Sequence, residues 1–403
     1  MPKLLHVNVV ANTGSTGRLA EYLINSAADA GWETYFAYGR AITQTRATPI
    51  RIGDKFDNYK NALLARVFDN EGFNAKSATK KFTEEIKRIS PDIIHLHNLH
   101  GYYVNLEILF DCLRETKIPV VWTLHDCWTF TGHCAYFDDV DCRKWLTACS
   151  ECPKFRDYPQ SFFRDNSKSN FERKREIFAA AKNVTFVTPS HWLENFARQS
   201  FLENHSIKTI HNGVDLAQFK PMDDAAAVRK KYGIEKEKIL LGVASPWSGR
   251  KGFADFIKLS ENLPGNVGIV LVGVSPQQRD LLPKNIAGIM RTDSVKELAA
   301  IYSLADVFLN PTYQDNFPTV NLEALACGTP VVTYDTGGSP ESVNAQVGAI
   351  VAKGNVLALR DAAVEFASKE KSAIAQTCRK HAEAFFSTEV YCKDYMELYR
   401  SMI

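Results

Sequence analysis

The sequence predicts an α/β protein of two domains, each built on a doubly wound parallel sheet. Apolar runs that suit strands alternate with helical stretches along the chain, which is the pattern of βαβ units. Two segments, 4–31 and 238–263, each contain an apolar strand, a loop of small residues and an amphipathic helix, like the opening unit of such a sheet. A chain of 403 residues is also long for one hydrophobic core, so two domains of roughly 150 to 220 residues are expected.

Further apolar runs extend this pattern through both halves of the chain. They lie at residues 34–39, 92–97, 120–125, 184–190 and 208–213 in the first half and at 267–273, 306–311 and 330–335 in the second. Residues 212–221 break both periodicities with Gly, Pro and polar side chains, so the junction is expected near residue 220. The predicted parts are an N-terminal domain, a linker, a C-terminal domain and a final helix, at 1–218, 219–236, 237–385 and 386–403.

The composition is that of an ordinary globular protein and excludes some classes of function. With 45% hydrophobic residues, 23% charged residues and a formal net charge of +2, nothing suggests disorder or a nucleic-acid-binding surface. No apolar run reaches the roughly 18 residues of a membrane span, and the N-terminus lacks the features of a secretory signal. We therefore expect a cytoplasmic protein whose contact with a membrane, if any, is peripheral.

Residues 310–341 are the most informative stretch and predict an anion-binding loop and helix. An apolar strand leads into a loop that holds Asp315. A helical pattern begins after Pro318, contains Glu323 and is closed by Gly328. The first turn of a helix offers unpaired N–H groups and the positive end of the helix dipole, which together suit a phosphate.

The two acids of this stretch suggest the shape of the ligand. Asp315 and Glu323 could accept hydroxyl hydrogen bonds from opposite ends of an elongated molecule with a phosphate at its middle. A nucleotide sugar has that layout. The alternative is an ordinary βαβ crossover with acids on its surface.

The same stretch resembles the donor-site signature of the retaining glycosyltransferases of family 4, which have the GT-B fold. In that signature an acid, seven residues and a glutamate precede an A-C-G-x-P-V-V run and a G-G-x-x-E turn, and residues 315–341 fit it without gaps. Asp315 stands where the family most often has glutamate. Pro318 replaces the commoner glycine and has no N–H to donate to a phosphate. The resemblance implies two Rossmann-like domains that face each other across a cleft, with the final helix packing back on the first domain.

The resemblance also implies roles for individual residues. Glu323 would hold the ribose and Asp315 the hydroxyls of the donor sugar. The remaining donor-binding residues would be their neighbours Asn316, Phe317, Thr319 and Val320. Transfer would proceed with retention, and the leaving phosphate would accept the proton of the acceptor, so that no separate base is needed.

A second loop, 248–252, places Arg250 and Lys251 between a strand and a helix, where both cations could clamp a diphosphate. In family 4 an Arg and a Lys usually stand five residues apart at this loop. Lys251 matches the Lys, but the Arg position falls on Pro246, so Arg250 would do that work. Without the resemblance, such a pair is usually a solvated face. These cations can neutralise the departing diphosphate. The sequence has no obvious Asp-x-Asp motif for a divalent ion, because the spacing at 138–141 lies in the Cys-rich insert, so we expect a metal-independent reaction that requires no cofactor.

In the first half, His125 and Asp126 follow a strong strand and resemble the H-D motif of family 4, whose His points into the cleft near the sugar. His125 could donate a hydrogen bond to a sugar hydroxyl or to the reaction centre. A lone His at a strand end is more often structural, and that alternative stays open. Asp126 is assigned to the acceptor side.

Two further groups of residues are candidates in the first half. His95 and His97 lie on one face of a strand, and similar H-x-H-N strings in related glycosyltransferases place His97 and Asn98 on the acceptor side. A metal site and a partly buried strand end are the alternatives. Gly14 and Gly17 would let the first loop approach the donor phosphate or the acceptor. Because this loop is not G-x-G-x-x-G, a dinucleotide cofactor is not expected.

An insert at about 127–160 holds four of the nine cysteines, Cys134, Cys142, Cys149 and Cys152. Only the last pair has the two-residue spacing of a zinc knuckle. A structural Zn²⁺ held by four thiolates would stiffen this insert. Four reduced thiols, or a role of the insert in acceptor recognition, are the alternatives. The other cysteines are expected to be small buried residues rather than disulfides.

Basic and aromatic residues alternate in 58–68 and 161–178, which could rest on an anionic membrane that carries a lipid-linked acceptor. Amphipathic helices that face their own core are the alternative.

The function expected from all these features is transfer of a hexose from a UDP- or GDP-sugar to a saccharide hydroxyl, in surface polysaccharide biosynthesis. A sugar-nucleotide epimerase or hydrolase, or a non-catalytic nucleotide-sugar-binding subunit, is the alternative.

Overall fold

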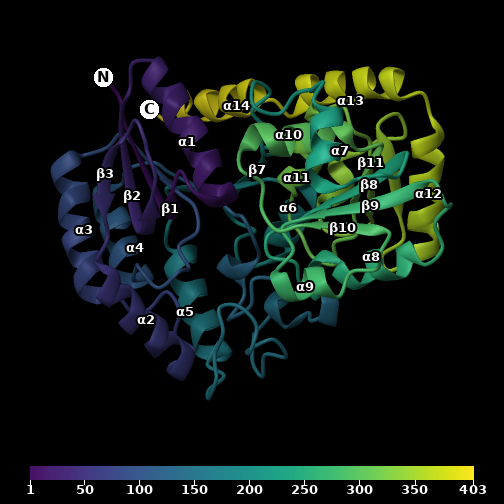
Figure 1. The fold of residues 1–403 in the computed structure, drawn as a ribbon. Helices are drawn as coiled ribbons and strands as arrows, with labels where there is room; N and C mark the ends of the chain where they lie inside the picture. The colour runs from purple at the N-terminus through teal and green to yellow at the C-terminus, as the bar shows by residue number, and fades with distance from the viewer. The chain divides into compact units, whose positions relative to one another are not determined.

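The computed structural model describes the whole chain, residues 1–403, as two compact units (Figure 1). Unit 1 comprises Met1–His211 and Cys392–Ile403, and unit 2 comprises Asn212–Tyr391. Each unit contains one sheet of parallel strands with helices packed around it, so the predicted α/β class with two doubly wound sheets is confirmed. The chain passes into unit 2 after His211, slightly before residue 218, where the sequence predicts the end of the N-terminal domain.

The sheet of unit 1 has seven strands in the order β3-β2-β1-β4-β5-β6-β7, all of them parallel. The strands are β1 (Lys3–Ala11), β2 (Glu33–Ile42), β3 (Thr48–Arg51), β4 (Ile93–Leu96), β5 (Val120–Thr123), β6 (Val184–Thr188) and β7 (Ser206–Thr209). The strand order reverses between β1 and β4. In open parallel sheets, ligands bind beyond the carboxyl ends of the strands at this switch point, and the residues that follow β1 and β4 include Gly14, His97 and Asn98.

Six helices and three short 3-10 turns complete the main part of unit 1. They are α1 (Gly14–Asp29), α2 (Lys55–Phe68), α3 (Lys76–Ile89), α4 (Leu106–Thr116), α5 (Ser167–Ala179), α6 (His191–Gln199), η1 (Trp128–Phe130), η2 (Asp138–Val140) and η3 (Lys144–Leu146). The Cys-rich insert contains only the three short turns, so regular backbone hydrogen bonding contributes little to its order.

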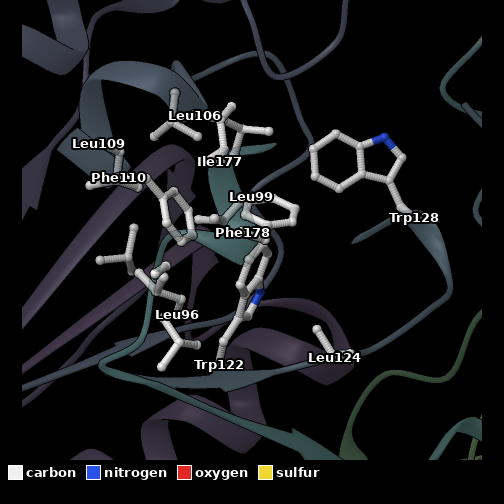
Figure 2. Packing of buried hydrophobic residues seen from close by; sticks show 14 of the residues in the cluster. Leu96, Leu99, Leu106, Leu109, Phe110, Trp122, Leu124, Trp128, Ile177 and Phe178 are labelled. Atoms are coloured by element: carbon white, nitrogen blue, oxygen red, sulfur yellow. The ribbon is translucent and has the colours of Figure 1, made fainter. Parts of the chain in front are cut away.

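Aromatic side chains from three elements of unit 1 pack together in its core (Figure 2). Phe110 of α4, Trp122 of β5 and Phe178 of α5 are each at most 1% exposed, and Phe178 lies 4.9 and 5.0 Å from the other two ring centres. Each such ring buries about 150–250 Å², which stabilises the fold by at most roughly 4–6 kcal/mol. Trp122 also donates its indole N–H to the carbonyl oxygen of His97 at 2.9 Å. The core therefore fixes the backbone just after β4, where predicted site residues begin.

The sheet of unit 2 has six parallel strands in the order β10-β9-β8-β11-β12-β13. They are β8 (Lys238–Val243), β9 (Val267–Val272), β10 (Ile286–Ile289), β11 (Val307–Asn310), β12 (Val331–Tyr334) and β13 (Gly348–Val351). Here the order reverses between β8 and β11, so the two loops predicted to bind the donor follow adjacent strands at the switch point.

The helices of unit 2 surround this sheet. They are α7 (Ala225–Tyr232), α8 (Phe253–Ser260), α9 (Pro276–Asp280), α10 (Val295–Leu304), α11 (Thr319–Ala326), α12 (Val356–Ser368) and α13 (Lys371–Phe385), with 3-10 turns η4 (Gly249–Lys251) and η5 (Ser339–Ser342). None of the helices combines the length and apolar character that a membrane span requires.

The last helix, α14 (Thr388–Arg400), begins in unit 2, and its residues from Cys392 onward belong to unit 1. Tyr395 and Tyr399 are fully buried. Their hydroxyl groups hydrogen-bond to Thr123 Oγ1 at 2.7 Å and to His95 Nδ1 at 2.6 Å. The end of the chain is thus part of the core of unit 1.

Candidate functional site

The stretch predicted to bind an anion lies in unit 2 as β11, a loop over 311–318 and α11. Pro318 is the N-cap residue of α11 with extended backbone, and no side chain caps the first turn. Gly328 follows the last turn with a φ of +84°, a conformation that glycine adopts without strain. Because helical N–H groups point toward the N-terminus, those of Thr319 and Val320 point back toward the loop that holds Asp315.

The loop after β8 is joined to the loop after β11. The Tyr313 N–H donates to the Arg250 carbonyl oxygen at 2.7 Å, and Lys251 forms an ion pair with Asp315. Gly252 has a φ of +72°, and a Cβ there would lie 2.2 Å from the Pro311 carbonyl oxygen. The structure therefore brings together the predicted catalytic residues of unit 2, and only glycine permits so close an approach of the two loops.

The turn over 337–341 supports the same loop from another side. Gly337 has a φ of +59°, and a Cβ there would lie 1.8 Å from the carbonyl oxygen of Asp315. The buried Asn321 side chain of α11 donates to the Oγ atoms of Ser339 and Ser342, both at 3.0 Å, and accepts from Asn310 at 2.8 Å. Because each of these buried polar groups is paired, this network fixes the turn against the start of α11.

The other predicted donor-binding residues differ in what they can offer to a ligand. Glu323 is 7% exposed, and one of its carboxylate oxygens accepts from the Tyr302 hydroxyl at 3.0 Å. Phe317 packs its ring in the core beside Phe386, with ring centres 5.8 Å apart, so only its backbone can bind a phosphate. Asn316 is buried at 3% exposure, whereas Thr319 and Val320 are half-buried in the first turn of α11.

Sequence reasoning missed three residues that support the donor loop. Asp255, buried in the first turn of α8, accepts hydrogen bonds from the hydroxyls of Tyr313 and Tyr334 at 2.8 and 2.9 Å. Burial and the hydrogen bond to Asp255 raise the pKa of Tyr313 to about 12, so its hydroxyl remains a donor. An acid in the first turn of a helix usually indicates only a favourable helix dipole, and no sequence pattern links it to the two tyrosines.

In unit 1, His125 and Asp126 lie side by side in the sequence but bind different partners. His125 Nε2 lies 3.2 Å from Nδ1 of His97, and burial lowers the pKa of His125 to about 4, so its imidazole is neutral at pH 7. The Asp126 carboxylate is hydrogen-bonded to Nε2 of His100 at 2.9 Å and accepts a second hydrogen bond from the Trp128 N–H at 2.9 Å. Burial alone would raise the pKa of Asp126, but the interactions with His100 and the Trp128 N–H outweigh it and lower this pKa.

The remaining predicted residues of unit 1 lie around the switch point between β1 and β4. Gly14 opens α1 with a φ of +64°, and no atom would lie within 4 Å of a Cβ there. Gly17 is tighter, because a Cβ would lie 3.2 Å from the Asn12 backbone nitrogen. The Asn98 carbonyl oxygen accepts from the Tyr103 hydroxyl at 2.7 Å, whereas the Asn98 side chain is half-buried and is the part of this residue that can contact a ligand.

The three histidines near β4 form a buried group. His6, His95 and His97 have ring nitrogens within 4.8 Å of one another. His95 is already bonded at both nitrogens, to Tyr399 at 2.6 Å and to Thr123 at 2.7 Å. The three rings are therefore buried and hydrogen-bonded to one another or to neighbouring hydroxyls, and the acceptor-side role of His97 stays a prediction.

The four cysteines of the insert all line one small cavity together with His133 and Trp145. Cys134 and Cys152 share a hydrogen bond, which lowers the pKa of Cys152 to about 7. The backbone N–H groups of Gly132 and Lys154 also donate to Cys149 and Cys152. The four sulfur atoms do not supply three ligands within 4.8 Å of one another, so the structure shows no finished coordination shell and the zinc site stays a prediction.

The two basic and aromatic segments differ in their exposure. Over 161–178, α5 turns Phe171 and Phe178 into the core. On α2, by contrast, Phe56, Tyr59 and Leu63 are 75%, 77% and 62% exposed. Their spacing places these three side chains on one face of the helix.

The loop beside α2 enlarges this exposed face. Phe162 and Phe163 are also exposed, and the Phe162 N–H donates to the carbonyl oxygen of Arg66 at 2.8 Å. The guanidinium of Arg164 lies 5.4 Å from the ring centre of Phe68. We call the exposed side chains of Phe56, Tyr59, Leu63, Phe68, Phe162 and Phe163 the α2 patch.

Comparisons with known proteins place these features in a family. Residues 16–218 match the family model described as Glycosyltransferase Family 4, and residues 237–369 match the one described as Glycosyl transferases group 1. The putative colanic acid biosynthesis glycosyl transferase WcaC of Escherichia coli K12 is 24% identical, over 99% of this chain and 100% of that protein.

Solved structures show the same fold. Sucrose-phosphate synthase of Thermosynechococcus elongatus superposes with a TM-score of 0.71 at 17% identity, over 100% of this chain and 99% of that one. HepE of Anabaena, solved in complex with UDP, gives a TM-score of 0.67 at 17% identity over 100% of both chains. At this identity the likeness establishes the fold alone, and it confirms the prediction of a GT-B protein.

Proposed function

The chain belongs to glycosyltransferase family 4 and is a glycosyltransferase. On this premise we propose that it transfers a hexose from a nucleoside diphosphate sugar bound in unit 2. The observation that supports this donor best is the joining of two loops, by Lys251 and Asp315, next to the uncapped first turn of α11. Cations and free N–H groups suit a diphosphate, and the neighbouring acid suits sugar hydroxyls. The neighbour HepE was solved with UDP, which makes a uridine nucleotide the first donor to test.

In this proposal, each side chain acts where charge develops. Departure of the nucleoside diphosphate builds negative charge on the leaving oxygen, which Lys251, Arg250 and the N–H groups of Thr319 and Val320 stabilise. Asp315 holds Lys251 in place before the donor arrives and accepts hydrogen bonds from the sugar hydroxyls. Because side chains and N–H groups supply the positive charge, the proposed reaction needs no divalent ion, and addition of a chelator should leave the rate unchanged.

We further propose that Glu323 binds the ribose. It lies one turn into α11, where one of its carboxylate oxygens accepts from the Tyr302 hydroxyl at 3.0 Å. A ribose diol offers two hydroxyl donors, which a carboxylate accepts well. Retention of configuration is proposed from family membership, with the leaving phosphate taking the proton of the acceptor. The roles of His97, Asn98, His125 and Asp126 stay predictions that substitution can test.

The proposed acceptor is a saccharide hydroxyl in the assembly of a surface polysaccharide. The name of the relative WcaC, which spans all of this chain, supports this class of acceptor. A lipid-linked saccharide is proposed because the α2 patch could hold the enzyme at a lipid surface. Three large apolar side chains of α2 are more than 60% exposed, and Lys55, Lys60 and Arg66 are exposed on the same helix. Such a combination binds anionic interfaces.

Donor binding and transfer can be measured directly. Calorimetry with a panel of UDP- and GDP-sugars should show binding of one of them, and release of nucleoside diphosphate should require a saccharide acceptor. Release without any acceptor would identify a donor hydrolase instead. Failure of every nucleotide sugar to bind the folded protein would refute the proposed donor class.

Membrane contact needs a separate experiment. The protein should sediment with vesicles that contain phosphatidylglycerol more than with vesicles of phosphatidylcholine alone. Leu63→Ser should weaken this binding, whereas Leu357→Ser, at a leucine 58% exposed on α12 of unit 2, should not. Equal binding by both variants would contradict a role of the α2 patch.

A further inference from the structure

Three imidazoles form an unbranched chain in unit 1. His6 Nδ1 lies 3.0 Å from His97 Nε2, and His97 Nδ1 lies 3.2 Å from His125 Nε2. The ring planes of the two pairs differ by only 17° and 18°, and the ring centres are 5.3 and 5.5 Å apart. These centre separations exceed the N···N distances by about two ring radii, so the bonded nitrogens lie on the line between the rings. Both contacts have the geometry of linear hydrogen bonds.

The chain arises from the order of the strands. His6 lies on β1, His97 follows β4 and His125 follows β5, and these three strands are neighbours in the sheet. The side chains therefore succeed one another across the strands. The chain starts in the core, where His6 is fully buried, and ends at the half-buried His125.

All three rings are neutral at pH 7. Burial lowers the pKa of His6 to about 3, that of His125 to about 4, and that of His97 well below its usual range. No carboxylate is hydrogen-bonded to any of the three, since Asp126 binds His100 and Trp128. The adjacent His95 binds Tyr399 and Thr123 instead.

Neutral rings make the chain directional. Each neutral imidazole has one N–H donor and one acceptor nitrogen. Each of the two hydrogen bonds needs one donor and one acceptor nitrogen, so both must point in the same direction along the three rings. The tautomer of the first ring therefore sets the tautomer of the last. His6 Nε2 is buried without a hydrogen-bond partner. If the chain ran inward, this atom would be an N–H without an acceptor, which is rarer in protein interiors than an acceptor without a donor.

We propose that His6 and His97 are positioning residues that hold His125 as the Nδ1–H tautomer. The His6 Nδ1–H donates to His97 Nε2, the His97 Nδ1–H donates to His125 Nε2, and the proton of His125 stays on Nδ1. This is the opposite of free histidine, in which the Nε2–H tautomer predominates. Nδ1 of His125 has no protein partner and lies at the less buried end of the chain, so it presents a fixed N–H donor.

The fixed tautomer restricts what His125 can do. Its outer nitrogen can donate a hydrogen bond to an oxygen, such as a sugar hydroxyl, but cannot act as a base. This use of the N–H rests on the proposed glycosyl transfer, whereas the tautomer itself does not. Loss of donor binding would therefore refute the proposed function and leave the tautomer untouched.

Long-range ¹H–¹⁵N NMR spectra of protein labelled with [¹⁵N]histidine test the proposal at pH 7. His6, His97 and His125 should each show a protonated Nδ1 and an unprotonated Nε2, with assignment by single substitutions. A protonated Nε2 on His125, or nitrogen shifts averaged between the two tautomers, would overturn the proposal. This spectrum of the unaltered protein decides the matter even if a variant fails to fold.

Two variants of His97 separate positioning from mere packing. His97→Leu removes the donor to His125 Nε2, so the Nδ1–H form of His125 should fall to a minority and kcat should fall with it. His97→Gln restores one acceptor and one donor at similar spacing and should recover the Nδ1–H form. His205→Gln, at a histidine that is not one of the three bonded rings, should leave the signals of His125 unchanged. Retention of the pure Nδ1–H form in His97→Leu would show that the chain does not set the tautomer.

Discussion

The contact between Lys251 and Asp315 links the charge of one loop to the position of another. Lys251 follows β8, Asp315 follows β11, and their side chains form an ion pair that is mostly buried. A partly buried pair is screened less by salt than a surface pair, so it orients both groups. The same two residues are the ones that the proposed reaction needs beside the diphosphate and the sugar.

Removing either charge should therefore slow transfer. Lys251→Met deletes a cation next to the developing negative charge and should lower kcat by about 10²–10³-fold, and Asp315→Asn should lower kcat and raise KM for the donor. Lys258→Met, which removes an exposed cation from the neighbouring α8, should leave both unchanged. Rates of diphosphate release measure these effects, and a Lys251→Met enzyme as fast as its parent would contradict the assignment.

The close approach of Gly337 to the donor loop leads to a second prediction for a single residue. A Cβ at Gly337 would lie 1.8 Å from the Asp315 carbonyl oxygen, and its φ is +59°. Gly337→Ala should displace the loop and weaken donor binding more than tenfold. Gly233→Ala is the matched control, because Gly233 has a φ of +64° but no atom within 4 Å of its Cβ. That variant should lose only about 1–2 kcal/mol of unfolding free energy and bind the donor normally, as calorimetry can show. Equal donor affinities in the two variants would contradict the contact.

Among the elements, the strands at the centres of both sheets were predictable. Of the four edge strands three were missed, and the run predicted at 208–213 only partly overlaps the fourth, β7 (Ser206–Thr209). The runs at 92–97, 120–125, 306–311 and 330–335 correspond to β4, β5, β11 and β12, which are buried on both faces and therefore apolar throughout. The strands β3, β10 and β13 were missed. Each has four residues, lies at the edge of its sheet and is partly exposed. β3 (TPIR) contains a proline and a charged residue, and the apolar stretches of β10 (IAGI) and β13 (GAIV) are short and contain Gly and Ala, which are depleted in strands.

The candidate site was predictable to a similar extent. Asp315, Glu323 and Lys251 lie in strings with a recognisable spacing, because loop and helix geometry near a phosphate allows few alternatives. Asp255 and His6 could not be found in this way. Each acts through residues distant in sequence, Asp255 through two tyrosines and His6 through His97, and such contacts arise only when the sheet forms.

Asp69 connects three elements of unit 1 around the Cys-rich insert. It ends α2 with a φ of +50°, one carboxylate oxygen lies 2.5 Å from His133 Nδ1, and the other accepts the Asn166 N–H at 2.8 Å. Because the pair with His133 is buried, Asp69→Ala should lower the unfolding free energy by about 3–5 kcal/mol. Asp69→Asn keeps an acceptor for His133 and tolerates the positive φ, so its loss should be smaller. Urea denaturation compares the two, and equal losses would show that the carboxylate is not the connecting group.

The zinc predicted for the insert is testable by metal analysis. If the four thiols that line the cavity close around a metal, purified protein should contain about one zinc ion per chain, and Cys152→Ser should reduce this content. Cys112→Ser, at a buried cysteine outside the insert, should not change it. A chain without bound metal, in which all nine thiols react with a thiol reagent after unfolding, would favour reduced cysteines instead.

In the whole molecule, the two units share an architecture but not a continuous stretch of chain. Unit 2 is one segment, whereas unit 1 needs both ends of the sequence. The second end supplies two buried tyrosines to a sheet whose other parts lie in the first 211 residues. The folding of unit 1 therefore depends on contacts between residues far apart in the sequence, such as that between His95 and Tyr399.

Shortening the chain should reveal this dependence. Removal of Cys392–Ile403 takes away Tyr395 and Tyr399, both fully buried. His95 Nδ1 then loses its partner, and Thr123 Oγ1 keeps only its hydrogen bond with His95 Nε2. Loss of one large buried aromatic side chain costs about 3–5 kcal/mol, so unit 1 should become sensitive to protease while unit 2 stays resistant. Removal of Ser401–Ile403 alone should have little effect, and Tyr399→Phe should cost about 1–3 kcal/mol because it leaves the His95 ring nitrogen unpaired. Limited proteolysis with mass spectrometry locates the cuts. Protection of unit 1 in the longer truncation would mean that its core is complete without the last helix.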